Sequence, residues 1–191
     1  MIDKIITEAT DAVAAAVQGV DNVLDAVVGS VKGQVVNVLQ TAGEVGTTTV
    51  EAVASVADGA IRGAGSVGAS LTDTVFSTMS GVVGGVSQVG GNVIDAVRGA
   101  AEGIIKATAD TGGDIGSAAV STVEGAIKAA GDVGLDTAQA AQAAASGVLT
   151  AATEVGGDAA SKAREAMLSA ASLPRDIIES VIQGSGDNDK K

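Results

Sequence analysis

Apolar side chains recur along most of the chain at steps of three or four residues. From Val89 onward they fall at Val93, Val97, Ala100, Ala101, Ile104 and Ile105. This spacing places apolar residues on one face of a helix, whereas a half-buried strand would alternate apolar and polar residues. Charged residues such as Asp95 and Lys106 fall on the opposite face. The pattern therefore predicts amphipathic α-helices and an all-α fold.

A Val-Gly pair recurs every 22 residues. It stands at 45–46, 67–68, 89–90, 133–134 and 155–156, with Thr111-Gly112 in the one remaining place. A second glycine keeps the same step, at Gly59, Gly81, Gly103, Gly125 and Gly147. Two eleven-residue units make 22 residues, at about 3.67 residues per turn, so the apolar stripe stays on one side of a helix. The sequence therefore predicts tandem 22-residue amphipathic helical repeats.

Two arrangements of these repeats are open. In one, the chain is a single long helix with eleven residues per three turns, lying on a surface. In the other, helices of about 16 residues are joined by glycine turns, and sequential helices are antiparallel neighbours. The second arrangement predicts helix starts near Val27, Thr49, Leu71, Val93, Ile115, Thr137 and Ala159.

Residues that favour helix N-caps follow the Val-Gly positions. They are Thr48, Ser70, Asn92, Asp114, Asp136 and Asp158. Such side chains accept hydrogen bonds from free backbone N–H groups at a helix start. Glycine just before them can end the previous helix in the left-handed conformation. On an unbroken helix the same residues would simply face water.

The second set of glycines falls in the middle of the predicted helices. Each such glycine costs about 1 kcal/mol relative to alanine. The repeated cost has two explanations: close helix–helix approach, or softening of a helix that forms only on a surface. The sequence leaves both open.

Four segments divide the chain. Residues 1–22 are predicted to form a degenerate amphipathic helix, and 23–173 carry the 22-residue repeats. Pro174 suits a helix start, so a short helix is expected over 174–183. Gly184 is expected to end it, leaving a disordered tail at 184–191.

The composition removes most chemistry. The chain has no His and no Cys, so the usual general base and sulfur ligands are missing. We expect no enzyme activity, no cofactor and no metal site. The formal charge is −12 and the only aromatic residue is Phe76. Nucleic-acid binding needs basic patches and often stacking aromatics, so that class is excluded.

The segments VEGAIKAAGDVG and AEGIIKATADTGG resemble the eleven-residue repeats of synucleins and perilipins. The resemblance covers most of the chain and concerns periodicity and composition. It implies an amphipathic coat on membranes or lipid droplets. Synuclein repeats carry paired lysines that attract anionic lipid, whereas this chain is acidic. A neutral surface, such as an oil droplet or a polyester granule coated in the manner of phasins, is therefore favoured.

Two functions follow from these features. The first is a coat on a lipid or storage-granule surface, with the protein cytoplasmic and peripheral on that surface. The alternative is a structural protein that assembles with itself into a helical array, filament or shell. In both, the expected partner is a lipid or polymer surface, further copies of the chain, or both. The apolar residues expected to face that surface or partner are Val45, Val53, Val67, Leu71, Val75, Val89, Val93, Val97, Ile104, Ile105, Ile115, Ile127, Val133 and Val155.

Overall fold

The computed structural model describes residues 23–42, 47–66 and 68–188, and these ranges contain helices and turns without a strand. The prediction of an all-α fold is therefore confirmed. The predicted helix over 1–22 lies outside the described residues. The helices are α2 (Val23–Ala42), α3 (Thr47–Ser66), α4 (Leu71–Gln88), α5 (Val93–Asp110), α6 (Ile115–Asp132), α7 (Thr137–Val155), α8 (Gly157–Ser169) and α9 (Arg175–Asn188).

Glycine turns separate the central helices, so the described chain is not one continuous helix. The glycines of four turns have a positive φ of 71–74°, namely Gly68, Gly90, Gly112 and Gly134. The next residue donates its N–H to a carbonyl five residues back, as Leu135 does to Ala130 O at 2.8 Å. This is the Schellman arrangement, in which a left-handed residue ends a helix. Helices α4 to α7 begin where the spacing predicts, at Leu71, Val93, Ile115 and Thr137.

Other boundaries differ from the predictions. Helix α2 begins at Val23, α3 at Thr47 and α8 at Gly157, and the central helices have 18 or 19 residues. Helix α9 continues to Asn188 instead of ending at Gly184. Gly184 has no positive φ, so its backbone follows the helix and the predicted stop does not occur.

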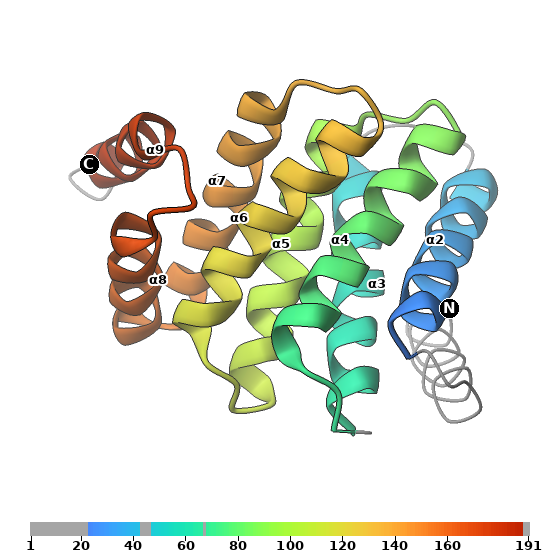
Figure 1. The fold of residues 1–191 in the computed structure, drawn as a ribbon, viewed down its shortest axis with the longest axis horizontal. Helices are drawn as coiled ribbons and strands as arrows, with labels where there is room; N and C mark the ends of the chain where they lie inside the picture. Colours follow the sequence, from blue (N-terminus) through green and yellow to red (C-terminus); the bar gives the residue numbers. More distant parts are fainter. Residues whose placement is uncertain (1–22, 43–46, 67, 189–191) are drawn as a thin grey trace.

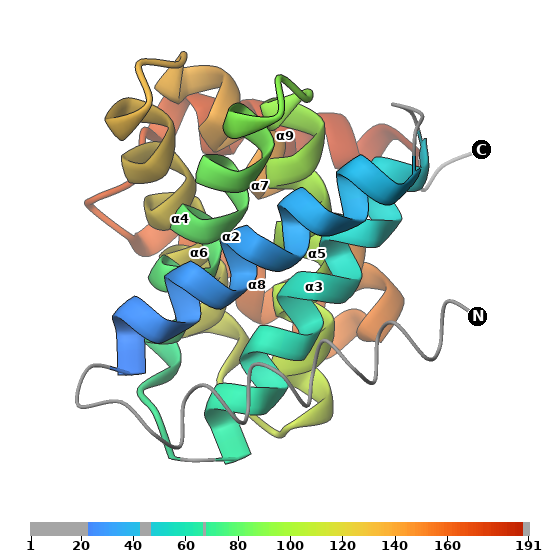
Figure 2. The same ribbon diagram turned by 90° about the vertical axis from the view of Figure 1, so that its right-hand side faces the viewer.

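The helices form two layers (Figure 1). Helices α3, α5 and α7 lie side by side in one layer, and α2, α4, α6 and α8 lie in the other. From α2 to α8, consecutive helices run in opposite directions, which makes alternate helices parallel within a layer. Consecutive helices are in contact, as the short turns predict, but the most extensive contacts join alternate helices. Figure 2 looks onto the end of the array, where α2 and α3 lie against each other.

Mid-helix glycines explain why alternate helices come so close. A Cβ added at Gly147 of α7 would lie 2.5 Å from the carbonyl oxygen of Arg98 in α5. One added at Gly81 of α4 would lie 2.8 Å from Cβ of Val31 in α2. At Gly103 it would overlap the carbonyl oxygen of Ala54 in α3. Of the two explanations for these glycines, the described contacts therefore support close helix–helix approach.

The core between the layers consists mainly of Val, Ala and Ile. Its largest fully buried side chains include Met79, Ile104, Ile105, Leu149 and Met167. Three buried threonines donate their hydroxyl to the helix carbonyl four residues back, as Thr108 Oγ1 does to Ile104 O at 2.7 Å. The buried hydroxyl of Thr78 has no hydrogen-bond partner within the described part of the chain. Small side chains bury little area each, so cohesion depends on many close backbone contacts. Among the described helices, none is long and apolar enough to cross a membrane.

Candidate functional site

Most apolar residues expected to face a surface or partner face other helices of the same chain. Those that are buried are Val53, Val75, Val93, Val97, Ile104, Ile105 and Ile115. Leu71, Val89 and Ile127 are half-buried. Val133 and Val155 are exposed, at 38% and 44%. Val45 and Val67 lie outside the described residues. The candidate site is thus a set of helix-packing faces, and most of these faces are covered by other helices of the same chain.

Four of the six N-cap candidates cap helices. Asn92 Oδ1 accepts from the N–H groups of Ile94 and Asp95, at 3.1 and 3.3 Å. The side chains of the other three caps also accept from backbone N–H groups of the first turn; they are Ser70 of α4, Asp114 of α6 and Asp136 of α7. The Asp114 carboxylate accepts from Ser117 N–H at 2.6 Å, and this bond lowers the pKa of Asp114.

Two N-cap candidates are misplaced. Thr48 is the second residue of α3, because that helix begins at Thr47. Asp158 lies in the first turn of α8, where Gly156 occupies the cap position and no side chain makes a cap bond. Gly156 has φ 148° and ψ 164°, unlike the four left-handed turn glycines. The α7–α8 connection is therefore shorter than the other turns, and α8 begins at Gly157, two residues earlier than the predicted start at Ala159.

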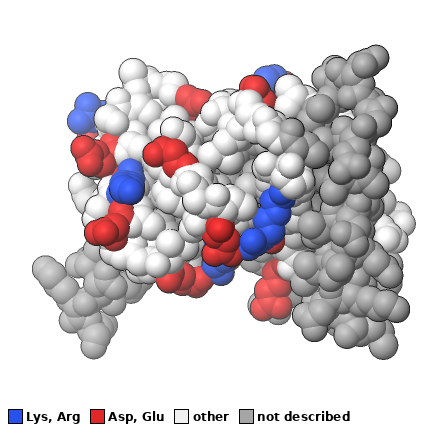
Figure 3. Space-filling view, turned by 90° about the horizontal axis from the view of Figure 1, so that it is seen from below, with Lys and Arg blue, Asp and Glu red and all other residues white. Residues whose placement is uncertain are grey.

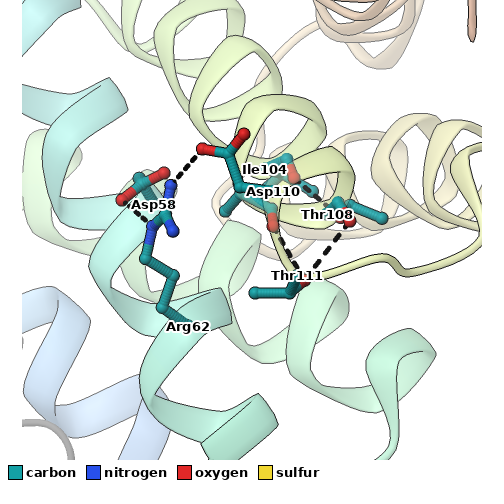
Figure 4. A network of polar contacts seen from close by, with 7 residues as sticks. Asp58, Arg62, Ile104, Thr108, Asp110 and Thr111 are labelled. Atoms are coloured by element: carbon teal, nitrogen blue, oxygen red, sulfur yellow. Dashed lines mark hydrogen bonds and ion pairs between the residues drawn. The ribbon is translucent and has the colours of Figure 1, made fainter.

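Ion pairs join the parallel helices of the α3–α5–α7 layer. Arg62 of α3 bonds Asp58 on its own helix through Nε at 2.7 Å, and its Nη2 reaches Asp110 of α5. Figure 4 shows the guanidinium between these two carboxylates. The bonds to Asp58 and then Asp110 raise the pKa of Arg62.

The same acid–cation–acid set recurs 44 residues along, at Glu102, Lys106 and Glu154. Lys106 Nζ of α5 lies 2.7 Å from the carboxylate of Glu154 in α7, and this bond raises the pKa of Lys106. Burial is the main cause of the raised pKa of Glu102, with repulsion from Glu154 adding to it. Exposed pairs contribute little stability each, but these two link neighbouring helices at fixed positions.

The apolar periodicity places these charges on the polar face of each helix and does not indicate which residues they pair with. The signal that could have revealed the pairs is the step of two repeats, because Arg62 and Lys106, like Asp110 and Glu154, lie 44 residues apart. Two helices of one layer are separated by two repeats, so a 44-residue step marks positions that are equivalent within a layer.

An open hollow of about 500 Å³ lies where α3 ends, α4 begins and α5 ends. Its lining comprises Ile61, Arg62, Gly65, Ser66, Ala69, Leu71, Thr74, Thr111 and Gly113. The polar groups there already have partners: Thr74 Oγ1 donates to Ser70 O at 2.8 Å, and Thr111 Oγ1 to Ala107 O at 2.8 Å. The hollow therefore offers no convergent set of unpaired polar groups.

Charged side chains are spread over the surface. Seen from below, acidic and basic side chains stand beside one another, with uncharged surface between them (Figure 3). Within the described residues, no three His, Cys, Asp or Glu side chains gather in a way that could hold a metal ion. The repeated helix faces, rather than a pocket, are the feature that recurs through the molecule.

Compared with known proteins, the chain matches no protein-family model and no curated protein. The helix-packing faces and the surface that the array leaves exposed are therefore the features that bear on function.

Proposed function

We propose that the chain is a non-enzymatic structural protein, a self-packed helical array that associates with further copies into a larger array, filament or shell. One observation carries this proposal. The apolar stripe that a surface coat would present is buried between helices of the same chain, as at Val75, Val97 and Ile105, each 0% exposed. Such a chain holds its helical form without an external surface.

The layered geometry supports growth by repetition. Each layer contains parallel helices in close contact at mid-helix glycines, as at Gly81, Gly103 and Gly147, so an added helix can dock by a contact of the kind that its neighbours already use. Large apolar side chains that remain exposed offer points of association between copies. They are Val133, Leu135, Val155 and Leu168.

A coat on a neutral lipid or polymer surface is the second candidate. It is favoured by the core, which consists largely of Ala and Val. Each helix therefore buries only small side chains against its neighbours, and the same amphipathic stripes could exchange helix partners for a neutral surface. On this route the array opens, and the side chains at Val97 and Ile105 turn to the surface.

Far-UV circular dichroism and sedimentation, with and without a neutral lipid emulsion, separate the two candidates. The structural proposal expects full helicity in buffer, no change on adding lipid, and a sedimentation coefficient that rises with protein concentration. A weak helical signal that becomes strong only with lipid would overturn the structural proposal and support the coat. Full helicity with a monomer at every concentration would overturn the self-association.

A substitution pair sharpens the test. Val97→Asp places a charge in the core, so it should unfold the array under the structural proposal whether or not lipid is present. Gln142→Asp, on the exposed side of α7, is the matched control and should leave helicity unchanged. If Val97→Asp is fully helical in buffer and fails only in binding lipid, the packed-array proposal is wrong.

A further inference from the structure

The contact between α2 and α4 uses two glycines one turn apart. A Cβ added at Gly81 would meet Val28 O at 2.9 Å and Cβ of Val31 at 2.8 Å. One added at Gly85 would meet Lys32 O at 3.0 Å and Cβ of Val35 at 3.1 Å. The two glycines therefore pack on two equivalent positions of α2. Each position consists of a backbone carbonyl and the valine three residues later.

The sequence of α2 repeats every four residues through this contact, as VVGS, VKGQ and VVNV over 27–38. Val27, Val31 and Val35 open these units, and all three are buried. On α4, Gly81 and Gly85 keep the same step. If α2 slides by four residues along α4, Val35 takes the place of Val31 beneath Gly81. The new contact is nearly the same as the old one.

The register of α2 differs from that of other pairs in the array. Gly103 contacts the carbonyl of Ala54, and Gly147 that of Arg98, each 49 residues earlier. Gly81 contacts Val28, which is 53 residues earlier. Helix α2 is thus displaced by one turn from the register that α3–α5 and α5–α7 adopt.

We propose that α2 occupies a second register on α4, one helical turn away, in which Gly81 seats on the carbonyl of Lys32 and on Val35. The change is a slide of about 6 Å along the helix axis with a rotation of about 40°, since four residues rise 1.5 Å each and turn 100° each. Gly85 then meets Leu39 in place of Val35. One-turn shifts of a helix past its neighbour are a known form of two-state switching. This inference is independent of the proposed function.

The α3–α5 and α5–α7 pairs lack this freedom. In α5, a slide of four residues under Gly147 brings Ile105 to the place of Ala101, which is far smaller. The same slide separates Lys106 from Glu154. In α3 it separates Arg62 from Asp110. Overpacking a tight contact is destabilising, so these pairs are held in one register and α2 is the element that slides.

Disulfide trapping tests the proposal, because the chain has no native cysteine. The Cβ position of Gly84 is 3.9 Å from Cδ of Lys32 and has no other neighbour within 4 Å. Lys32→Cys with Gly84→Cys reports the present register. Val36→Cys with Gly84→Cys reports the second register, and Val28→Cys with Gly84→Cys reports a slide in the opposite direction.

Trapping rates under mild oxidation decide the outcome. The Val36 pair should trap more slowly than the Lys32 pair, by about 10- to 1000-fold for a minor state of about 0.1–10%. The Val28 pair should trap no faster than the same chain in denaturant. Equal rates for the Val36 and Val28 pairs, or no trapping of the Lys32 pair, would overturn the proposal.

The equivalent positions in the α5–α7 pair give a matched control. Glu102→Cys with Thr150→Cys should trap, and Lys106→Cys with Thr150→Cys should not. The Lys106→Cys variant also loses the ion pair with Glu154, so this control depends on Ile105, which is too large for the place of Ala101 beneath Gly147. Circular dichroism checks that each variant is folded. If Gly84→Cys does not fold, spin labels on Gln40→Cys and Gln142→Cys supply a second measurement. A minor second distance population supports the slide, and a single population with no second component above about 0.1% overturns it.

Discussion

Glycine serves opposite purposes in two regions of this molecule. In the contact region, where alternate helices meet, Gly103 has ordinary helical backbone and no room for a side chain. In the turn region, Gly112 has φ 73° and nothing within 4 Å of its Cβ position. The first position lacks space and the second lacks an allowed conformation for other residues.

The comparison shows that one residue type, glycine, can specify both where a helix ends and where it contacts another helix. In α4, α5 and α6, the turn glycine ends the helix, and the contact glycine lets that helix approach the one two places earlier. Both glycines recur every 22 residues, so each of these three helices carries a stop signal and a docking position. The following substitutions separate these two purposes.

The largest effect is expected in the contact region. Gly103→Ala puts a methyl group onto the carbonyl of Ala54, so α3 and α5 must move apart, and the free energy of unfolding should fall by about 1–3 kcal/mol or more. Urea denaturation followed by circular dichroism measures it. Gly33→Ala is the matched control, because Gly33 is helical, exposed and open. It should stabilise by about 0.5–1 kcal/mol, and a loss equal to that of Gly103→Ala would refute the docking role.

The turn region should show a smaller loss that depends on conformation, not size. Gly112→Ala forces a left-handed alanine, which costs about 1–2 kcal/mol. Gly112→Asn is larger but tolerates this conformation better, so it should recover part of the loss in a thermal melt. If the asparagine variant is less stable than the alanine variant, space limits this turn after all.

Much of this division is readable from the sequence. The Val-Gly step and the polar residue after it place the starts of α4 to α7 correctly. The mid-helix glycines are visible in the sequence as positions of close contact, but the sequence does not show which helix each of them contacts. A 22-residue step is the same whether a helix packs on its neighbour, on the helix two places away, or on a surface, so the two-layer arrangement required the three-dimensional contacts.

Two of the errors fall where the repeat pattern of the sequence is intact. Thr48 and Asp158 have the residue type of a cap, yet α3 begins at Thr47 and the α7–α8 connection uses Gly156 without a side-chain bond. Gly184 was expected to stop a helix because of its type, but a glycine ends a helix only where the fold gives it a positive φ. The ion pairs of Arg62 and Lys106 were missed because their partners lie on another helix.

The caps sharpen the comparison further within the turn region. Asn92→Ala removes the oxygen that accepts from Ile94 and Asp95 N–H, which should destabilise by about 1 kcal/mol. Asp158→Ala, in a helix whose cap has no side-chain bond, loses only a charge near the helix start, about 0.3–1 kcal/mol. Chemical denaturation at low and high salt separates them, because salt screens the second effect alone. A strong salt dependence for Asn92→Ala would contradict the cap.

The smallest effect concerns charge in the contact region and reverses the sign seen in the turns. Burial raises the pKa of Glu102, so this carboxylate contributes most to stability when protonated, and that contribution is lost as pH rises through its folded-state pKa. Glu102→Gln should therefore stabilise slightly near pH 7, by no more than about 0.5 kcal/mol at this partly exposed position, and should lose that advantage near pH 3. The pKa of Asp114 is lowered, so its carboxylate stabilises the fold at neutral pH and loses that contribution as pH falls. The difference in free energy of unfolding between Asp114→Asn and the parent chain should therefore become smaller as pH falls. Unfolding of the parent and both variants across this pH range measures the two trends. A Glu102→Gln variant that is less stable at pH 7 than at pH 3, each relative to the parent, would show that Lys106 stabilises the Glu102 carboxylate by more than burial and Glu154 oppose it.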